Sequence, residues 1–177
     1  MTDIINLFNF IESNRPEYKT PLKAKLIYNP ESITEDDLNV KSSLNLTKTP
    51  ITTLPDNLKV GGNLYLTSTK ITTLPDNLKV GGSLDLTRTP ITSLPNNLTV
   101  EGNIDLTGIN ITSLPDNLTV GGSLHLTYTP ITLLPDNLTV GGNIDLTGTP
   151  LSKKYSKDEI LEMIQDKGGI VEGNIFI

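Results

Sequence analysis

A repeat of 20 residues constrains the fold of this chain more than any other sequence feature. The dipeptide Leu-Pro recurs at a strict interval of 20 residues, at Leu54-Pro55, Leu74-Pro75, Leu94-Pro95, Leu114-Pro115 and Leu134-Pro135. A fixed period of about 20 to 50 residues is typical of solenoids, in which each repeat packs only on its neighbours. We therefore expect a stacked array whose function lies on a repeated surface, and not in the pocket of a globular domain.

The apolar residues within one repeat predict strands rather than helices. If Ile71 is numbered position 1, apolar residues stand at positions 1, 4, 8, 10, 14 and 16 of the repeat Ile71–Pro90. The spacing of two at positions 8 and 10, and again at 14 and 16, is that of strands whose alternate side chains point inward. Gly81 and Gly82 permit a tight turn between them, and Pro75 favours extended backbone. The pattern predicts a mainly β solenoid, with one strand around position 15 and a second short extended segment around position 9.

The N-terminal end predicts a short helical cap. Residues 1–32 are assigned to a helical cap and lead-in, because the apolar residues between Ile4 and Ile11 favour a helix that ends at Asn14-Arg15-Pro16. This helix would cover the core of the first coil. Leu26-Ile27-Tyr28 is interpreted as a short strand that leads into the array. The basic residues of this segment are interpreted as a solvated charge run, and they are Lys19, Lys23 and Lys25.

The C-terminal end also predicts a helical cap. Residues 33–151 are assigned to a leucine-rich array of 20-residue coils, and residues 152–177 to a capping coil that contains a helix. Ser156-Lys157-Asp158-Glu159 has the pattern of a capping box, and Gly168 that of a helix C-cap. Val171–Ile177 repeats the pattern of Val100–Leu106, which predicts a final strand. Because few charges protect the edge at Ile175–Ile177, this strand could pair with a second copy to form a homodimer.

Charge and composition narrow the classes of partner and site. The formal net charge is −6 and the pI is about 4.7, which disfavours binding to nucleic acid or to anionic membranes. The absence of cysteine removes disulfides, thiolate metal sites and a cysteine nucleophile. Met1–Pro16 lacks the basic region of a signal peptide, and no apolar run approaches the roughly 20 residues of a membrane span. We expect a cytoplasmic protein.

Two positions of the repeat vary while its apolar positions barely change. Position 15 holds Asn45, Tyr65, Asp85, Asp105, His125, Asp145 and Phe176. Position 18 holds Lys48, Ser68, Arg88, Gly108, Tyr128 and Gly148. A rigid face with one variable residue per coil suits partner binding, and aromatic and charged residues are frequent hot spots. The candidate partner-binding residues are therefore Tyr65, Asp85, Arg88, Asp105, His125, Tyr128 and Asp145.

Four of these candidates form an acidic row interrupted by the single histidine. Asp85, Asp105, His125 and Asp145 would follow one another about 5 Å apart along a sheet. Carboxylates at that spacing repel each other by roughly 1–3 kcal/mol, and Arg88, a bound cation or a basic partner could relieve the repulsion. His125 could act as a pH-sensitive contact. The row has three interpretations: a solvated acidic face, a partner-binding surface or a metal site.

The segment Leu84-Asp85-Leu86-Thr87-Arg88-Thr89-Pro90-Ile91 resembles the LxLxxNxL core of leucine-rich repeats, with Thr89 in the place of asparagine. The 20-residue unit with Leu-Pro resembles the short bacterial type found in secreted effector proteins of pathogens. The pattern LPDNLxVGGxLxL is similar to uncharacterised repeat proteins of bacteriophages. The resemblance implies a concave strand face around position 15 that grips a protein. It also implies a ladder between turns at the asparagine position, where threonine hydroxyls would replace the amides and Ile109 would interrupt them.

No catalytic constellation is recognisable in the sequence. There is one histidine, no cysteine and no serine in a G-x-S-x-G elbow, and the Gly-Gly pairs lack the ending of a phosphate loop. We therefore expect a non-enzymatic protein–protein interaction module, without cofactor or bound metal, that binds an unidentified protein through the concave strand face. The bacteriophage resemblance implies a host-directed or anti-defence role. The alternative is a structural or assembly component that self-associates through its terminal strand.

Overall fold

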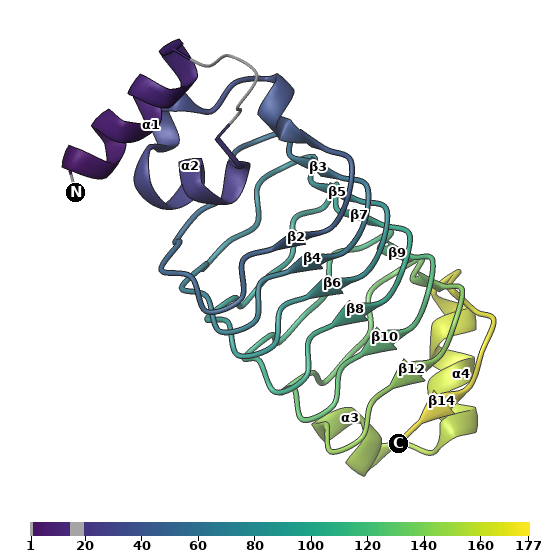
Figure 1. Ribbon diagram of the computed structural model, residues 1–177. Helices are drawn as coiled ribbons and strands as arrows, with labels where there is room; N and C mark the ends of the chain where they lie inside the picture. The colour runs from purple at the N-terminus through teal and green to yellow at the C-terminus, as the bar shows by residue number, and fades with distance from the viewer. Residues whose placement is uncertain (1, 15–19) are drawn as a thin grey trace.

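The chain forms a β-solenoid in the computed structural model, which describes residues 2–14 and 20–177. Figure 1 shows the coils stacked one behind another, with helices at both ends of the stack. Each coil contributes one short strand to each of two parallel, seven-stranded sheets, which we call sheet A and sheet B. The predicted mainly β solenoid with short helices at both ends is confirmed.

The strands lie where the apolar spacing predicts them. Sheet A contains, in spatial order, β1 (Asn39–Val40), β3 (Lys59–Val60), β5 (Lys79–Val80), β7 (Thr99–Val100), β9 (Thr119–Val120), β11 (Thr139–Val140) and β13 (Ile170–Val171). Sheet B contains β2 (Leu44–Asn45), β4 (Leu64–Tyr65), β6 (Leu84–Asp85), β8 (Ile104–Asp105), β10 (Leu124–His125), β12 (Ile144–Asp145) and β14 (Ile175–Phe176). Sheet A therefore uses positions 9 and 10 of the repeat, and sheet B uses positions 14 and 15.

The parallel register aligns the same position of successive coils. Leu64 lies opposite Leu84, and Leu84 lies opposite Ile104. The apolar positions consequently form continuous buried columns along the solenoid, and the side chains of Leu84 and Leu86 are fully buried. Because a coil of 20 residues buries its core only against its neighbours, the array is stable as a stack and not as single coils.

The first coil is covered by a helix that the sequence analysis did not identify. Helix α1 (Thr2–Asn14) confirms the expected helix, but its side chains Ile4, Leu7 and Phe10 are exposed and do not cover the coil. Helix α2 (Leu22–Tyr28) provides the cover, because Leu22 is buried in the core cluster and Leu26 packs against it. The prediction of a strand at Leu26-Ile27-Tyr28 is wrong. The carbonyl oxygen of Pro21 accepts hydrogen bonds from the amides of Ala24 and Lys25, and these bonds begin a helical turn. Residues Arg15 and Pro16 lie outside the described part.

Lys25 contradicts the interpretation of a solvated charge run. Its residue surface is 6% exposed, and its Nζ lies 2.9 Å from Oδ2 of Asp37. The amide and hydroxyl groups of Thr34 donate to the same carboxylate at 2.8 Å each. Burial raises the pKa of Asp37, but the hydrogen bonds from Thr34 and Lys25 and the charge of Lys25 outweigh it and lower the pKa overall. The pair joins α2 to the 3-10 helix η2 (Asp36–Leu38), and Lys25 Nζ also donates to the Ser32 carbonyl of the 3-10 helix η1 (Pro30–Ser32), at 3.3 Å. Lys23 is exposed as expected, and Lys19 lies outside the described residues.

The C-terminal helix forms where the sequence predicts it. Helix α4 (Lys157–Asp166) begins with the expected capping box, in which Ser156 Oγ accepts from the Glu159 amide and the Glu159 carboxylate accepts from the Ser156 amide. Gly168 follows the helix with a φ of 76°, in agreement with the expected C-cap. Ile160 and Ile164 are buried, so α4 supplies the core side chains that Leu-Pro turns supply elsewhere. A further helix, α3 (Pro150–Lys154), was not expected, and the Thr149 hydroxyl caps it by accepting from the Ser152 amide.

Adjacent coils are joined at position 13, a connection that the sequence analysis missed. This position alternates between serine and asparagine, as Ser43, Asn63, Ser83, Asn103, Ser123 and Asn143. Each side-chain oxygen accepts a hydrogen bond from the position-13 amide of the next coil, at 2.7 to 3.1 Å. Glycine at position 12 leaves room for the asparagine at position 13 of the preceding coil. A Cβ on Gly82 would collide with Oδ1 of Asn63, and a Cβ on Gly122 with Oδ1 of Asn103. We call these six hydrogen bonds the position-13 ladder.

The threonines at position 19 form no ladder between coils, contrary to the expectation. The hydroxyl groups of Thr49, Thr89, Thr129 and Thr149 each donate to the carbonyl oxygen three residues earlier in the same coil, at 2.6 to 2.7 Å. Ile109 therefore interrupts no connection between coils. Its side chain is buried, and its amide still donates to the Leu106 carbonyl at 3.2 Å.

Candidate protein-interaction surface

The variable residues at position 15 form one row along the outer face of sheet B. Tyr65 lies opposite Asp85, Asp85 opposite Asp105, Asp105 opposite His125, and His125 opposite Asp145. Asn45 and Phe176 extend the row at its two ends. We call these seven residues the position-15 row, and strands of one sheet place its members about 4.8 Å apart. Five of the seven candidate residues therefore share a single strip of surface, and the two others, Arg88 and Tyr128, lie outside it.

The threonine at position 17 holds the Asp85 carboxylate on this surface. Oδ1 of Asp85 accepts hydrogen bonds from the amide and the hydroxyl of Thr87, at 2.9 and 2.7 Å. Oδ2 accepts from the hydroxyl of Thr67 in the preceding coil, at 2.7 Å. These three donors fix the position of the carboxylate on the surface. Threonine hydroxyls thus offset the repulsion between carboxylates in the acidic row. We had expected Arg88, a bound cation or a basic partner to do so.

The other two carboxylates of the row also accept a hydrogen bond from the amide at position 17. Asp105 accepts from the Thr107 amide and Asp145 from the Thr147 amide, both at 2.9 Å. Burial raises the pKa of Asp145, but hydrogen bonds from Thr147 and Thr127 and the charge of His125 outweigh it, so the pKa lies below its usual value. Asp145 is therefore ionised at neutral pH. The row offers fixed negative charge at known positions.

Arg88 and Tyr128 lie in the turn that follows sheet B, where the backbone is left-handed. Both residues have a φ of 57°, and Lys48 and Ser68 have nearly the same value at this position. Gly108 and Gly148 occupy the corresponding turns without a side chain. A left-handed backbone costs a residue with a side chain about 1–2 kcal/mol relative to the right-handed form. Both candidate side chains are exposed, and the Tyr128 ring lies against Gly148, where an added Cβ would collide with it.

Tyr65 is positioned by a neighbour on the same strand. The side-chain amide of Asn63 donates to the Tyr65 hydroxyl at 2.7 Å, and the Oδ1 atom of the same asparagine serves the position-13 ladder. The sequence carries a signal for these supporting residues, since serine and asparagine alternate at position 13 and threonine is constant at position 17. The position-13 ladder could therefore have been found from the repeat alignment, whereas the constant threonines alone do not show which groups donate to the carboxylates.

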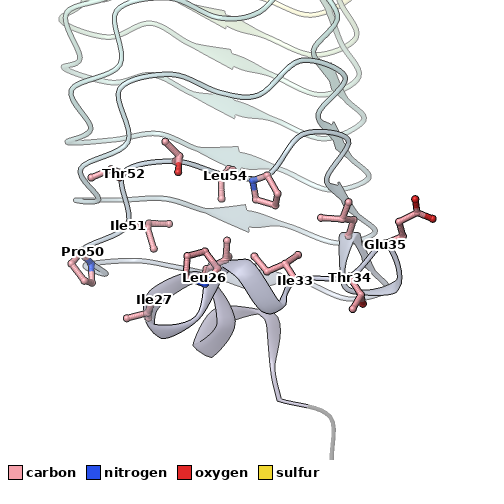
Figure 2. A pocket seen from close by; sticks show the side chains of 13 residues that line it. Leu26, Ile27, Ile33, Thr34, Glu35, Pro50, Ile51, Thr52 and Leu54 are labelled. Atoms are coloured by element: carbon pink, nitrogen blue, oxygen red, sulfur yellow. The ribbon is translucent and has the colours of Figure 1, made fainter. Parts of the chain in front are cut away.

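Other features of the described residues add no competing site on this face. Within residues 2–14 and 20–177, no three histidine, aspartate or glutamate side chains are grouped closely enough to hold a metal ion. No helix in the described part is long and apolar enough to cross a membrane. An open groove of about 570 Å³ lies at the N-terminal end, and Figure 2 shows Leu26 and Ile27 of α2 on one side of it and Ile51 and Leu54 on the other. None of the candidate residues lines this groove.

Comparison with known proteins returned no match to a family model, to a curated protein or to a solved structure.

Proposed function

We propose that this chain is a non-enzymatic module that binds a protein partner through the outer face of sheet B. The observation that supports this proposal most directly is the position-15 row, in which the side chain varies among five residue types on an otherwise uniform sheet. The residues that barely change have structural roles in the core and in the turns. Asparagine or aspartate at position 15 accepts a hydrogen bond from the amide at position 17, as Asn45 does from Thr47 at 3.0 Å, but Tyr65 and His125 occupy the same position in strands of the same register. The coil therefore does not dictate the tyrosine, histidine and aspartates that vary there.

The left-handed turns at position 18 support the same surface. Glycine removes the backbone strain of such a turn, as it does at Gly108 and Gly148. The scaffold alone would favour glycine at Arg88 and Tyr128 as well. Strained residues concentrate at functional sites, and tyrosine and arginine are enriched among the hot spots of protein interfaces. We therefore assign both side chains to the edge of the binding surface.

The partner that fits this surface carries a basic patch. Asp85, Asp105 and Asp145 hold three carboxylates in one strip, and opposite charge across an interface steers association and selects partners. The resemblance of Leu84–Ile91 to leucine-rich repeats is consistent with binding at this sheet, and the resemblance to bacteriophage repeat proteins makes a host protein the partner to seek first. No reaction is assigned to the site.

The experiment is affinity capture from a bacterial lysate with the whole chain as bait. We expect Asp105→Lys together with Asp145→Lys to release the captured protein. The matched control is Asp56→Lys with Asp76→Lys, which reverses the same number of charges at exposed turns away from sheet B. Thermal unfolding of both variants checks that the coils are intact. Capture that is equal for the two double variants and the unaltered chain would contradict the proposed surface.

A further inference from the structure

One coil departs from the repeat at a position that the fold leaves exposed. Five coils contain the Leu-Pro turn, and four of them carry threonine or serine at position 3, as Thr53, Thr73, Ser93 and Ser113. The fifth carries Leu133, which is 56% exposed. Position 3 is exposed in all five coils, so the core does not require an apolar residue there. The leucine therefore indicates a role outside the core.

Leu133 lines a pocket between its coil and the two C-terminal helices. Helices α3 and α4 stand where the next coil would have its Leu-Pro turn, and Figure 1 shows them at the C-terminal end of the stack. The pocket has a volume of about 100 Å³, and its apolar walls are Leu133 and Leu134 from the coil, Leu151 from α3, Tyr155 at the C-cap of α3, and Met163 from α4. Because the helices leave Leu133 more than half exposed, the packing of the chain on itself does not account for this leucine.

The volume of the pocket limits what it can hold. Sites for free small molecules usually have volumes of about 300–1,000 Å³, and an apolar cavity of about 150 Å³ takes up benzene. A pocket of about 100 Å³ therefore fits one branched aliphatic side chain, such as that of leucine, and is too small for an aromatic ring. Burial of one such side chain contributes less free energy than a millimolar dissociation constant requires. The occupant is therefore a side chain of a larger partner, whose neighbouring residues make further contacts.

The charged groups at the pocket are cationic. Lys167 lines the pocket, whereas no carboxylate of the described residues does. The Nζ atom of Lys167 is already paired with Asp136 Oδ1, at 2.8 Å. The Nζ atom of Lys154 lies 4.9 Å from the centre of the Tyr155 ring, and in the described part of the chain Lys154 forms no ion pair with a carboxylate. Its positive charge is therefore available to a partner, and it favours a carboxylate beside the apolar side chain.

We propose that this pocket binds a leucine side chain of a protein partner, at a place where the partner carries an acidic residue next to the leucine. The leucine fills the space between Leu133 and Met163, and the neighbouring carboxylate pairs with Lys154. The pocket lies outside both sheets, so this contact is separate from the position-15 row and does not rest on the proposed function. The row fits a basic patch and the pocket fits an acidic segment, so the two surfaces select opposite charges.

The first test is NMR titration of the isotopically labelled chain with short synthetic peptides. The probe has a central leucine with two glutamates on each side. We expect a dissociation constant in the millimolar range and chemical-shift changes at the amides of residues 132–134, Tyr155 and Met163. Control peptides replace the leucine by serine, the leucine by tryptophan, or the glutamates by lysines. Each control should bind about threefold more weakly or worse, and so should free 4-methylpentanoate, which offers the same branched chain and a carboxylate without a polypeptide.

Variants of the chain provide the second test. Leu133→Thr installs the residue of two other coils, Thr53 and Thr73, so it should keep the fold and weaken binding of the leucine peptide about fivefold. Lys154→Gln should weaken binding about twofold to fivefold, the range of a surface ion pair. The matched control is Leu161→Thr, which replaces another exposed leucine, on α4, that lies outside the lining of the pocket. This control should leave the dissociation constant unchanged.

Absence of binding of the leucine peptide up to about 10 mM would overturn the proposal. So would equal dissociation constants for the unaltered chain and Leu133→Thr, or binding of the tryptophan peptide, the lysine peptide or 4-methylpentanoate that is as tight as that of the probe. Shift changes confined to residues outside the pocket would also overturn it. Circular dichroism and thermal unfolding check that each variant is folded, and Lys154→Gln, at an exposed residue, keeps the proposal testable if Leu133→Thr fails to fold.

Discussion

The position-13 ladder links an asparagine in one coil to a glycine in the next, and this link can be measured. The Ser123 amide donates to Oδ1 of Asn103 at 2.7 Å. A Cβ on Gly122 would collide with the same Oδ1, and it would lie 2.9 Å from the Gly102 carbonyl carbon and 3.0 Å from the Asn103 nitrogen. The asparagine side chain therefore connects the coils and adds a collision at position 12 to those that the backbone already causes.

The geometry predicts the size of each effect. Asn103→Ala removes the acceptor of the Ser123 amide and should lower the free energy of unfolding by about 1–2 kcal/mol. Gly122→Ala forces the two coils apart and should cost about 2–3 kcal/mol. In the double variant the collision with Oδ1 is absent, although the close backbone contacts remain. We therefore expect the double variant to be about 1 kcal/mol more stable than the sum of the two single effects predicts.

The assay is urea denaturation followed by far-ultraviolet circular dichroism on all four chains. Asn103→Ala combined with Gly62→Ala is the control, because a Cβ on Gly62 would meet Ser43 and Ser42, which make no contact with Asn103 or Ser123. In the control pair we expect the two effects to add within about 0.5 kcal/mol. Additive effects for Asn103 and Gly122 would refute the reasoning, because the asparagine oxygen would then add nothing to the exclusion of a Cβ by the backbone.

Three further predictions concern the core, the caps and the turns. Asp37→Asn should destabilise the chain near neutral pH and flatten its acid dependence. The folded pKa of Asp37 is lowered, so the stability that its carboxylate contributes is complete above its unfolded pKa of about 3.9 and is lost as the pH falls through the folded pKa. Urea midpoints of both chains between about pH 6 and pH 2.5 measure this dependence. An equal change of midpoint with pH in both chains would contradict the prediction. Ile109→Thr should change the free energy of unfolding by less than about 1 kcal/mol, because the lost apolar contact is offset by a hydrogen bond from the new hydroxyl to the Leu106 carbonyl. Chemical denaturation measures this change. A loss above about 2 kcal/mol would show that the side chain at this position connects the coils. Arg88→Gly should raise the free energy of unfolding by about 1 kcal/mol, because glycine adopts the left-handed backbone of this turn without strain. The same variant should bind the captured partner more weakly. A lower melting temperature in thermal unfolding would instead show that the arginine stabilises the coil.

The repeat allows the inner coils to be predicted because one local pattern is copied many times. The alternation of Leu84 and Leu86 with polar residues determines both the strand and the face that it buries, and each copy supports the same interpretation. Helix α4 could be predicted for a similar reason, since its start and end signals, Ser156 with Glu159 and Gly168, depend on residues close in sequence.

The features that the sequence analysis missed depend on contacts outside the local pattern. Helix α2 was interpreted as a strand because Leu26-Ile27-Tyr28 is too short to show a period, and one contact that holds the helix in place joins Lys25 to Asp37, twelve residues away. The ladder was assigned to threonine at position 19 by family resemblance, whereas the hydrogen bonds between coils come from position 13. The left-handed turn at Arg88 and Tyr128 was missed because neither residue type favours that conformation. Within the candidate surface, the order of the row followed from the repeat, but the hydroxyl donors to Asp85 required the side-chain positions.

The most direct test of the account is calorimetric titration of the captured partner against charge-neutral variants of the row. Asp105→Asn with Asp145→Asn keeps an acceptor for the amides of Thr107 and Thr147, as Asn45 does for Thr47, and removes only the charge. We predict that the Kd rises about tenfold or more, which corresponds to about 1.4 kcal/mol, while Asp56→Asn with Asp76→Asn leaves the Kd unchanged. An unchanged Kd for the row variant would contradict the claim that the variable residues of sheet B bind the partner.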